Sequence, residues 1–307
     1  MAIFLVCYGH YIQYLLPTEP YKEIGYLLIY SFHMPLFMAI SGFFAYQSMC
    51  MDFLLFCKKY SKRLLIPCVT WSLGVIAMRI IFKEPLGWKE INNDLWFLKS
   101  LFICMLFAKI VFQEKNTSLR AIFLCATLLL SQAVPLYRLC YMYPSFIAGC
   151  FFSKHQHIFL KKSLKIGGIA LYGFLIYMFL DESFFDTHKI NQIPQVGGVL
   201  CVILTKMIVI LTGLSAICFL MSLVMQANVD WNKRIYKYGK YTLGIYLFQT
   251  VVVEHVCSCL LNVSWLPLQF LYIIIFPSIS IMCIFLGSYL QEKVTVPIAA
   301  KLLYGKF

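Results

Sequence analysis

The chain has 307 residues, of which 61% are hydrophobic and only 13% are charged. Soluble domains carry about 25% charged residues, so this composition, with a mean hydropathy of +0.80, excludes a soluble globular domain. Long apolar runs can each span the roughly 30 Å hydrocarbon core of a bilayer as one helix. They lie at 24–48, 64–82, 95–112, 199–225, 241–261 and 267–290, with shorter runs at 1–16, 121–135, 141–152 and 166–180. We therefore predict an all-α integral membrane protein with about ten transmembrane helices.

The net charge of +13 would suggest a nucleic-acid partner in a soluble protein, but its distribution indicates membrane topology instead. If the N-terminus is cytoplasmic and the ten runs alternate, the inner loops hold seventeen basic and four acidic residues. The outer loops then hold five basic and eight acidic residues. This asymmetry follows the positive-inside rule. It predicts that both termini are cytoplasmic and that the protein binds membrane lipid but no nucleic acid.

The thirteen cysteines are scattered mostly through the apolar runs, as small hydrophobic residues in helices are, rather than in a disulfide framework. His155 and His157 are too few ligands for a metal site. The chain contains no Walker, dinucleotide-binding, HExxH or GxSxG motif. We expect no metal and no permanently bound cofactor.

The run from Ser31 to Phe44 contains three features that cost free energy in a bilayer. Pro35 removes one backbone hydrogen bond and frees the carbonyl of Ser31. Gly42 gives up side-chain packing but lets a neighbouring helix approach closely. His33 places an ionisable group where such groups are expensive. Three such costs close together predict a functional site.

His10 and His33 lie on successive antiparallel runs, at depths of roughly 9 and 13 Å from the same side, so adjacent helices can bring them to one layer. The alternative is that each histidine is a packing residue, hydrogen-bonded to its neighbours. The first run is short and lacks the charged start of a signal peptide, so we expect the native first helix to begin upstream of Met1.

Two further features concern charge. Glu254 is a carboxylate in the middle of an apolar run, which by default is functional or paired, and Lys206 and Arg79 are its candidate partners. The loop at 49–63 is amphipathic and ends in a basic cluster that includes Lys62 and Arg63. This cluster either anchors the topology or binds the phosphates of an anionic cytosolic donor, since arginine offers bidentate geometry to phosphate.

Several short motifs resemble those of the membrane acyltransferase 3 family, in the family's order across most of the chain. The segment 5–10 (LVCYGH) resembles its first-helix LVxxGH, and 32–43 (FHMPLFMAISGF) resembles its HMPLF and SGF. The segments 62–67 (KRLLIP), 95–98 (LWFL) and 241–247 (YTLGIYL) resemble its RxxRLLxP, WFL and late S/T-LGIYLxH motifs. The likeness is closest to bacterial members of the fucose O-acetylase type, which O-acetylate sugars.

The resemblance implies a single polytopic acyltransferase domain over residues 1–307, in the bacterial inner membrane. Its donor would be cytosolic acyl-CoA, expected to be acetyl-CoA, and its acceptor a hydroxyl of a cell-surface glycan or lipid-linked precursor, as in polysaccharide, capsule or lipopolysaccharide modification. His10 would then be the catalytic base or acyl relay, with His33 beside it, because an imidazole can take a proton at neutral pH. Lys62 and Arg63 would bind the acyl-CoA. Ser41, Trp96 and Glu254 are candidate supporting residues.

Three departures from the family pattern bear on these roles. The arginine that often precedes the first-helix histidine would fall before the chain begins. The first arginine of RxxR falls on Tyr60, and the late histidine falls on Gln249. Two other functions stay open: a transporter or exporter that uses His10, His33 and Glu254 as a proton pathway, and a structural partner in a glycan-assembly complex.

Overall fold

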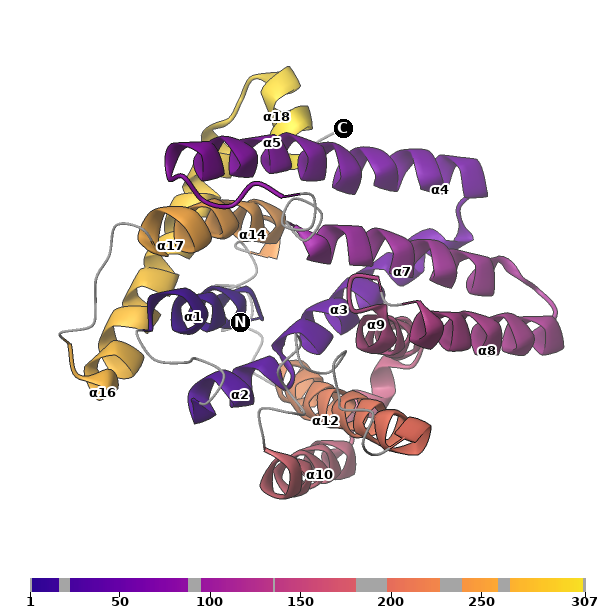
Figure 1. The fold of residues 1–307 in the computed structure, drawn as a ribbon. Coiled ribbons are helices and arrows are strands. Elements are labelled where there is room, and N and C mark those ends of the chain that lie inside the picture. Colours follow the sequence, from indigo (N-terminus) through magenta and orange to yellow (C-terminus); the bar gives the residue numbers. More distant parts are fainter. Residues whose placement is uncertain are drawn as a thin grey trace. The chain divides into compact units, whose positions relative to one another are not determined.

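The computed structural model describes residues 2–16, 23–87, 95–134, 136–180, 198–226, 239–258 and 266–305, and these form helices with no strand (Figure 1). The elements, in chain order, are α1 (Ala2–Leu15), α2 (Ile24–Tyr30), α3 (His33–Ala45), η2 (Tyr46–Cys50), α4 (Phe53–Tyr60), η3 (Ser61–Leu65), α5 (Ile66–Ile81), α7 (Trp96–Gln113), α8 (Thr117–Ala133), α9 (Leu139–Lys154), η4 (Gln156–Leu160), α10 (Lys162–Phe179), α12 (Gly198–Gln226), α14 (Thr242–Val251), η7 (Val252–Cys257), α16 (Leu268–Phe270), η8 (Leu271–Ile275), α17 (Phe276–Lys293) and α18 (Pro297–Tyr304). Met1, where the expected upstream extension would join, lies outside the described residues.

Six helices in the described ranges are long and apolar enough to cross a membrane, judged by length and composition. They are Ile24–Cys50, Phe53–Ile81, Trp96–Gln113, Lys162–Phe179, Val202–Gln226 and Leu268–Lys293. The runs at 1–16, 121–135 and 241–261 correspond to shorter apolar helices, whereas the run at 166–180 belongs to a helix of full length. The prediction of an all-α membrane protein is confirmed, and the count of ten spans stays a prediction.

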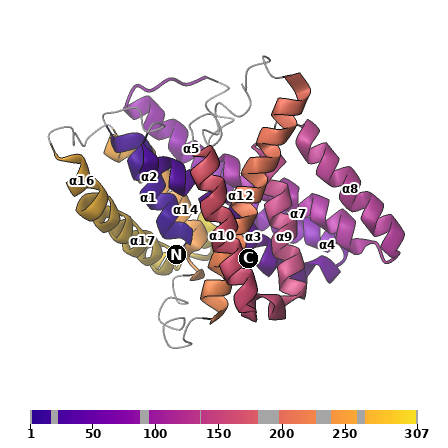
Figure 2. The same cartoon turned by 90° about the horizontal axis from the view of Figure 1, so that it is seen from below.

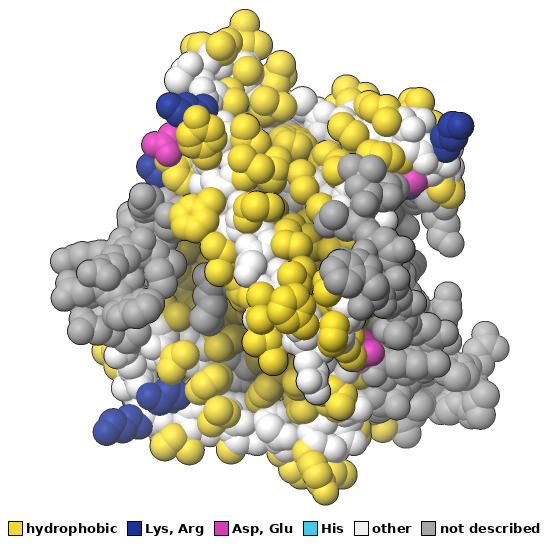
Figure 3. All heavy atoms as spheres, turned by 90° about the vertical axis from the view of Figure 1, so that its left-hand side faces the viewer, with side chains coloured by type: hydrophobic (Ala, Val, Ile, Leu, Met, Phe, Trp, Pro, Cys, Tyr) yellow, Lys and Arg dark blue, Asp and Glu magenta, His cyan; other side chains and the backbone are white. Residues whose placement is uncertain are grey.

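Large apolar side chains are exposed on several of these helices. On η8 and α17, for example, Ile273 is 74% exposed, Met282 61% and Phe285 55%. Hydrophobic side chains cover most of the described surface of the face in Figure 3, and the charged ones are few. A soluble monomer rarely exposes so much contiguous apolar surface, so these faces are suited to contact lipid.

The chain forms two compact units. The first comprises Met1–Pro20, Lys58–Lys99 and Lys233–Phe307, and the second comprises Tyr21–Cys57 and Ser100–Asn232. In the first unit, α14 packs against α17, and α5 packs against α18. In the second, α3 lies along α9 and α10 along α12 (Figures 1 and 2). The division into two units does not test whether residues 1–307 form a single domain, which stays a prediction.

The close crossing of α3 and α9 in the second unit depends on two glycines. A Cβ at Gly42 of α3 would overlap the carbonyl of Phe146, and one at Gly149 of α9 would overlap the carbonyl of Ala39. The thiol of Cys150 donates a hydrogen bond of 3.3 Å to the Gly42 carbonyl across this crossing. Small residues let membrane helices approach closely, so the close approach predicted at Gly42 is confirmed.

The helix of the second apolar run is interrupted at Ser31 and Phe32. Helix α2 ends at Tyr30 and α3 begins at His33, so Pro35 falls in the first turn of α3. Pro35 has no N–H to donate to the Ser31 carbonyl four residues earlier, and the interruption lies at that residue. The position of the break therefore agrees with the hydrogen bond that Pro35 was expected to remove.

We predict that Gly42→Ala destabilises the protein by about 1–3 kcal/mol, because a methyl group at this crossing forces the two backbones apart. Gly173→Ala on α10 is the matched control, since a Cβ there meets nothing within 4 Å and alanine is the better helix former. Thermal unfolding of the purified, detergent-solubilised variants measures both. An equal midpoint for Gly42→Ala and Gly173→Ala would contradict the prediction.

Candidate active site

A histidine and a glutamate meet inside the first unit. Helix α1 carries His10, and η7, which continues α14, carries Glu254; His10 Nδ1 lies 3.1 Å from Glu254 Oε1. The side chains are 16% and 18% exposed, so the pair is largely enclosed but still accessible to a ligand. The distance is that of an ion pair, but the angles between the imidazole and the carboxylate do not meet those of a hydrogen bond, and His10 Nδ1 has no hydrogen-bond partner in the described residues.

Tyr14, one turn after His10 on α1, contacts both His10 and Glu254. Its ring stacks on the His10 imidazole with centroids 5.9 Å apart and planes at 10°. Its hydroxyl donates to Glu254 Oε2 at 3.3 Å. Residues four apart share one helix face, which is why α1 can present both rings to η7. The three side chains therefore constrain one another's orientation.

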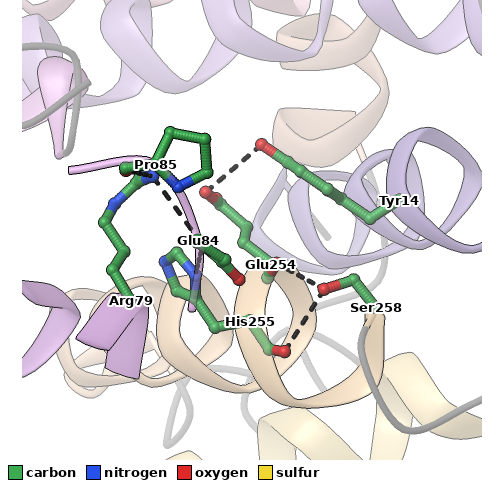
Figure 4. Close-up of polar contacts among 7 residues, drawn as sticks. All are labelled: Tyr14, Arg79, Glu84, Pro85, Glu254, His255 and Ser258. Carbon is green, nitrogen blue, oxygen red and sulfur yellow. Dashed lines mark hydrogen bonds and ion pairs between the residues drawn. The ribbon is translucent and has the colours of Figure 1, made fainter. Parts of the chain in front are cut away.

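The glutamate comes from a wide helical turn. Residues Val252–Cys257 form a π-helix, a conformation that is frequent at functional sites. The turn also carries His255, whose Nδ1 lies 2.8 Å from Glu84 Oε2. Figure 4 shows Glu254 and His255 leaving the same turn, with Glu84 and Arg79 on one side and Tyr14 on the other.

Arg79 completes this second group. Its Nη1 lies 3.7 Å from Glu84 Oε2 and donates to the carbonyl of Pro85 at 3.2 Å. Glu254, in contrast, contacts His10 and Tyr14, and Lys206 donates to the carbonyl of Gln132 in the second unit. Arg79, one of the two cations proposed as partners of Glu254, thus lies beside a different glutamate, Glu84. Glu84 and His255 are not among the site residues predicted from the sequence, although a histidine directly after a carboxylate in an apolar run is a usable signal.

His33 lies in the second unit, at the start of α3. It is 1% exposed, its Nδ1 donates to the carbonyl of Ile29 at 2.8 Å, and the Tyr30 ring stands edge-on at 4.5 Å. The bond satisfies a carbonyl at the break between α2 and α3, and the role of His33 in the site stays a prediction. Because His10 belongs to the other unit, the pairing of the two imidazoles stays a prediction.

The two other predicted supporting residues occupy ordinary positions in their helices. Ser41 Oγ donates to the carbonyl of Phe37 one turn earlier in α3, at 2.9 Å. Trp96 is the first residue of α7, with its ring edge-on to Phe97 at 6.2 Å. Phe97 in turn lies 5.5 Å from the ring of Tyr246 on α14. The geometry gives Trp96 a place in aromatic packing, and its role in the site stays a prediction.

Lys62 and Arg63 belong to a helix, which corrects the loop expected at 49–63. Asp52 caps α4 by accepting from the N–H groups of Leu54 and Leu55, and α4 continues through the π-helical segment η3 into α5. Pro67 follows four residues after Arg63, where its ring would clash with the Arg63 carbonyl in a regular α-helix. A wide turn before the proline relieves that clash. Arg63 is exposed and Lys62 half-buried.

The end of helix α18 packs against the basic turn at Lys62 and Arg63. It ends at Gly305, which has a φ of +60° and lies so close to Arg63 that a Cβ would stand 2.5 Å from the Arg63 carbonyl oxygen. Trp71 Nε1 donates to the carbonyl of Leu303 at 2.9 Å. Glycine suits this position because it adopts positive φ without strain and permits the contact. The end of α18 therefore packs directly against the Lys62–Arg63 turn.

Gln249 stands where the family motif has its late histidine. It is fully buried in α14, its Nε2 donates to Thr250 Oγ1 at 3.2 Å, and its Oε1 has no hydrogen-bond partner in the part of the chain that the structure describes. The described cysteines are free thiols. In the same ranges, no three His, Cys, Asp or Glu side chains gather as a metal site would require.

An all-helical membrane protein with imidazole–carboxylate pairs inside its helix packing has the groups that a membrane-embedded enzyme needs for proton transfer. The family comparison defines the class: the Acyl_transf_3 model, described as an acyltransferase domain, matches residues 1–290. The chain belongs to the acyltransferase 3 family and is a membrane acyltransferase. No curated protein and no solved structure matches it.

We predict that Glu254→Gln lowers acyl transfer by about 10- to 100-fold, because an amide keeps the shape of the side chain but loses the charge that orients His10. Glu292→Gln on α17 is the matched control, since this glutamate is exposed. Incorporation of radiolabelled acyl groups by membranes that carry each variant measures the effect. Equal rates for the two variants would remove Glu254 from the site.

Proposed function

We propose that the chain is an O-acetyltransferase of the bacterial inner membrane. It moves an acetyl group from cytosolic acetyl-CoA to a hydroxyl of a cell-surface glycan or of its lipid-linked precursor, as part of polysaccharide, capsule or lipopolysaccharide modification. In this proposal the chain crosses the membrane about ten times, with both termini in the cytoplasm. The observation that carries the proposal is the His10–Glu254 pair, 3.1 Å apart and stacked against Tyr14, in a chain of the acyltransferase 3 family.

The pair fits the chemistry of acyl transfer to an alcohol. The acceptor oxygen attacks the thioester carbonyl while His10 takes the hydroxyl proton, and the carbon–sulfur bond then breaks. The protonated His10 returns that proton to the departing thiolate, so that one ester and one thiol replace one thioester and one alcohol. Glu254 stabilises the imidazolium that forms between these steps. With Nδ1 turned toward Glu254, His10 Nε2 is the nitrogen left for the substrate.

The donor is proposed to bind at Lys62 and Arg63. The exposed guanidinium of Arg63 can meet a phosphate with two parallel hydrogen bonds, and Lys62 adds a second positive charge next to it. The turn is helical and packs against the end of α18, which Trp71 also binds. A turn ordered before binding takes up a phosphate at a lower entropic cost than a flexible loop does.

The remaining predicted residues have supporting places in this proposal. His33 shapes the start of α3 through its bond to Ile29, Ser41 lies on the same helix, and Trp96 opens α7. Membership of an acyltransferase family favours this enzyme over a transporter that would use His10, His33 and Glu254 to carry protons.

We predict that His10→Ala abolishes glycan acetylation, with a loss of about 100-fold or more, because general base catalysis contributes roughly that factor. The gene is deleted and complemented with either variant, and ester-linked acetyl groups released from the surface glycan by mild alkali are measured. His157→Ala is the matched control, since His157 is exposed on η4. An unchanged acetyl content on deletion refutes glycan acetylation, and full restoration by His10→Ala refutes the catalytic role of His10.

Arg63→Ala is predicted to weaken acetyl-CoA binding to the purified protein by about tenfold, since a charge-assisted hydrogen-bonded contact is worth roughly 1.5–3 kcal/mol. Arg63→Lys is expected to recover only part of the affinity, because lysine lacks the bidentate fork. Lys161→Ala, an exposed cation at the start of α10, is the control. Calorimetric titration with acetyl-CoA measures all three, and unchanged binding by Arg63→Ala would leave this basic turn as a topology anchor only.

A further inference from the structure

His255 is a second buried imidazole in the first unit, and the reaction proposed above does not use it. The residue is 3% exposed, and its Nδ1 lies 2.8 Å from Glu84 Oε2 in hydrogen-bond geometry. The two residues are 171 positions apart in the chain, so this bond joins the segment after α5 to the π-helical turn η7. Figure 4 shows Glu84 next to the His255 imidazole, with Arg79 on the left.

The glutamate determines which nitrogen of His255 carries the hydrogen. An ionised carboxylate only accepts hydrogen bonds, so Nδ1 must be the donor, and in the neutral ring Nε2 then has a free lone pair. The Arg79 guanidinium, 3.7 Å from the same carboxylate oxygen, places a permanent positive charge beside Glu84. The imidazole is thus held as a hydrogen-bond acceptor that faces away from Glu84.

Nε2 of His255 has no hydrogen-bond partner within the described ranges, although the atom is buried. Buried polar atoms are hydrogen-bonded in the large majority of cases, and an unsatisfied acceptor costs free energy unless a donor arrives. His33 provides the contrast, because its bond goes to a carbonyl of its own helix pair. Nε2 of His255 thus offers an unused acceptor, the chemical complement of an O–H donor.

The position of this acceptor connects it to the catalytic pair. Glu254 precedes His255 in the same π-helical turn and contacts His10 at 3.1 Å. We propose that His255, oriented by Glu84, binds a second hydroxyl of the acceptor while His10 deprotonates the first. The acceptor class is therefore a polyol, with a free hydroxyl near the one that is acetylated. This inference rests on the proposed acetyl transfer to a glycan.

The test separates binding of the acceptor from chemistry. Membrane vesicles that carry the full chain receive radiolabelled acetyl-CoA and increasing amounts of the host strain's surface glycan, de-esterified by mild alkali. Alkali-labile label in the glycan gives kcat and KM for the acceptor. His255→Asn keeps a donor at the Nδ1 position but lacks Nε2, so KM should rise about tenfold or more with kcat nearly unchanged.

Two further variants keep the test valid if His255→Asn folds poorly. His255→Gln places an amide oxygen near the position of Nε2 and should restore most of the acceptor affinity. Glu84→Gln removes the charge that fixes the ring hydrogen on Nδ1 and should raise KM as His255→Asn does. His157→Asn on η4 is the exposed control and should leave KM unchanged.

The outcomes distinguish this inference from the proposed function. A wild-type KM in His255→Asn and in Glu84→Gln overturns the role of His255 while acetylation itself stands. A fall in kcat with an unchanged KM also overturns it, because His255 would then act on the chemical step or on the fold. Absence of labelled glycan with the wild-type chain overturns the proposed function, and this inference with it.

Discussion

Polar groups enclosed among apolar helices have to find their partners within the protein, and this constraint organises the first unit. Hydrocarbon offers no hydrogen bonds, so an imidazole or a carboxylate in a helix packing becomes stable only beside another polar group. His10 and Tyr14 on α1 meet Glu254 on η7, and Tyr14 and Glu254 are 240 residues apart in the chain. This contact joins the first helix to a late one, and it forms the imidazole–carboxylate pair to which we assign the proton transfer in the proposed reaction.

Wide helical turns carry both sets of side chains to which we assign a function. At η3 the turn precedes Pro67 and carries Lys62 and Arg63, and at η7 it carries Glu254 and His255. A π-helical turn inserts an extra residue into the helical repeat and so changes the direction in which side chains leave the helix. An ordinary helix would present consecutive residues at fixed angles. The turn at η7 instead meets α1 with one residue and the segment after α5 with the next.

The histidines show why burial alone does not identify a functional group. His33 and His255 are both almost fully buried. The Nδ1 of His33 is bonded to a backbone carbonyl at a helix break, whereas His255 is bonded to a carboxylate and keeps an unsatisfied Nε2. A carbonyl bond anchors an imidazole to the backbone, while a carboxylate bond orients it as a proton or hydrogen-bond acceptor. The group bonded to Nδ1 of a buried histidine therefore indicates whether Nε2 can act as a proton or hydrogen-bond acceptor.

The sequence by itself determined the membrane class, the helical runs and the close approach at Gly42, because hydropathy and residue size act locally. It also selected His10 and Glu254 as candidate site residues. Only the tertiary structure decided that Glu254 meets His10 and Tyr14, that Arg79 lies beside Glu84, and that His255 has an unsatisfied nitrogen. It also showed that 53–63 is helical. These features depend on which helices lie side by side and where a turn widens, and no local pattern of residues encodes contacts between distant segments.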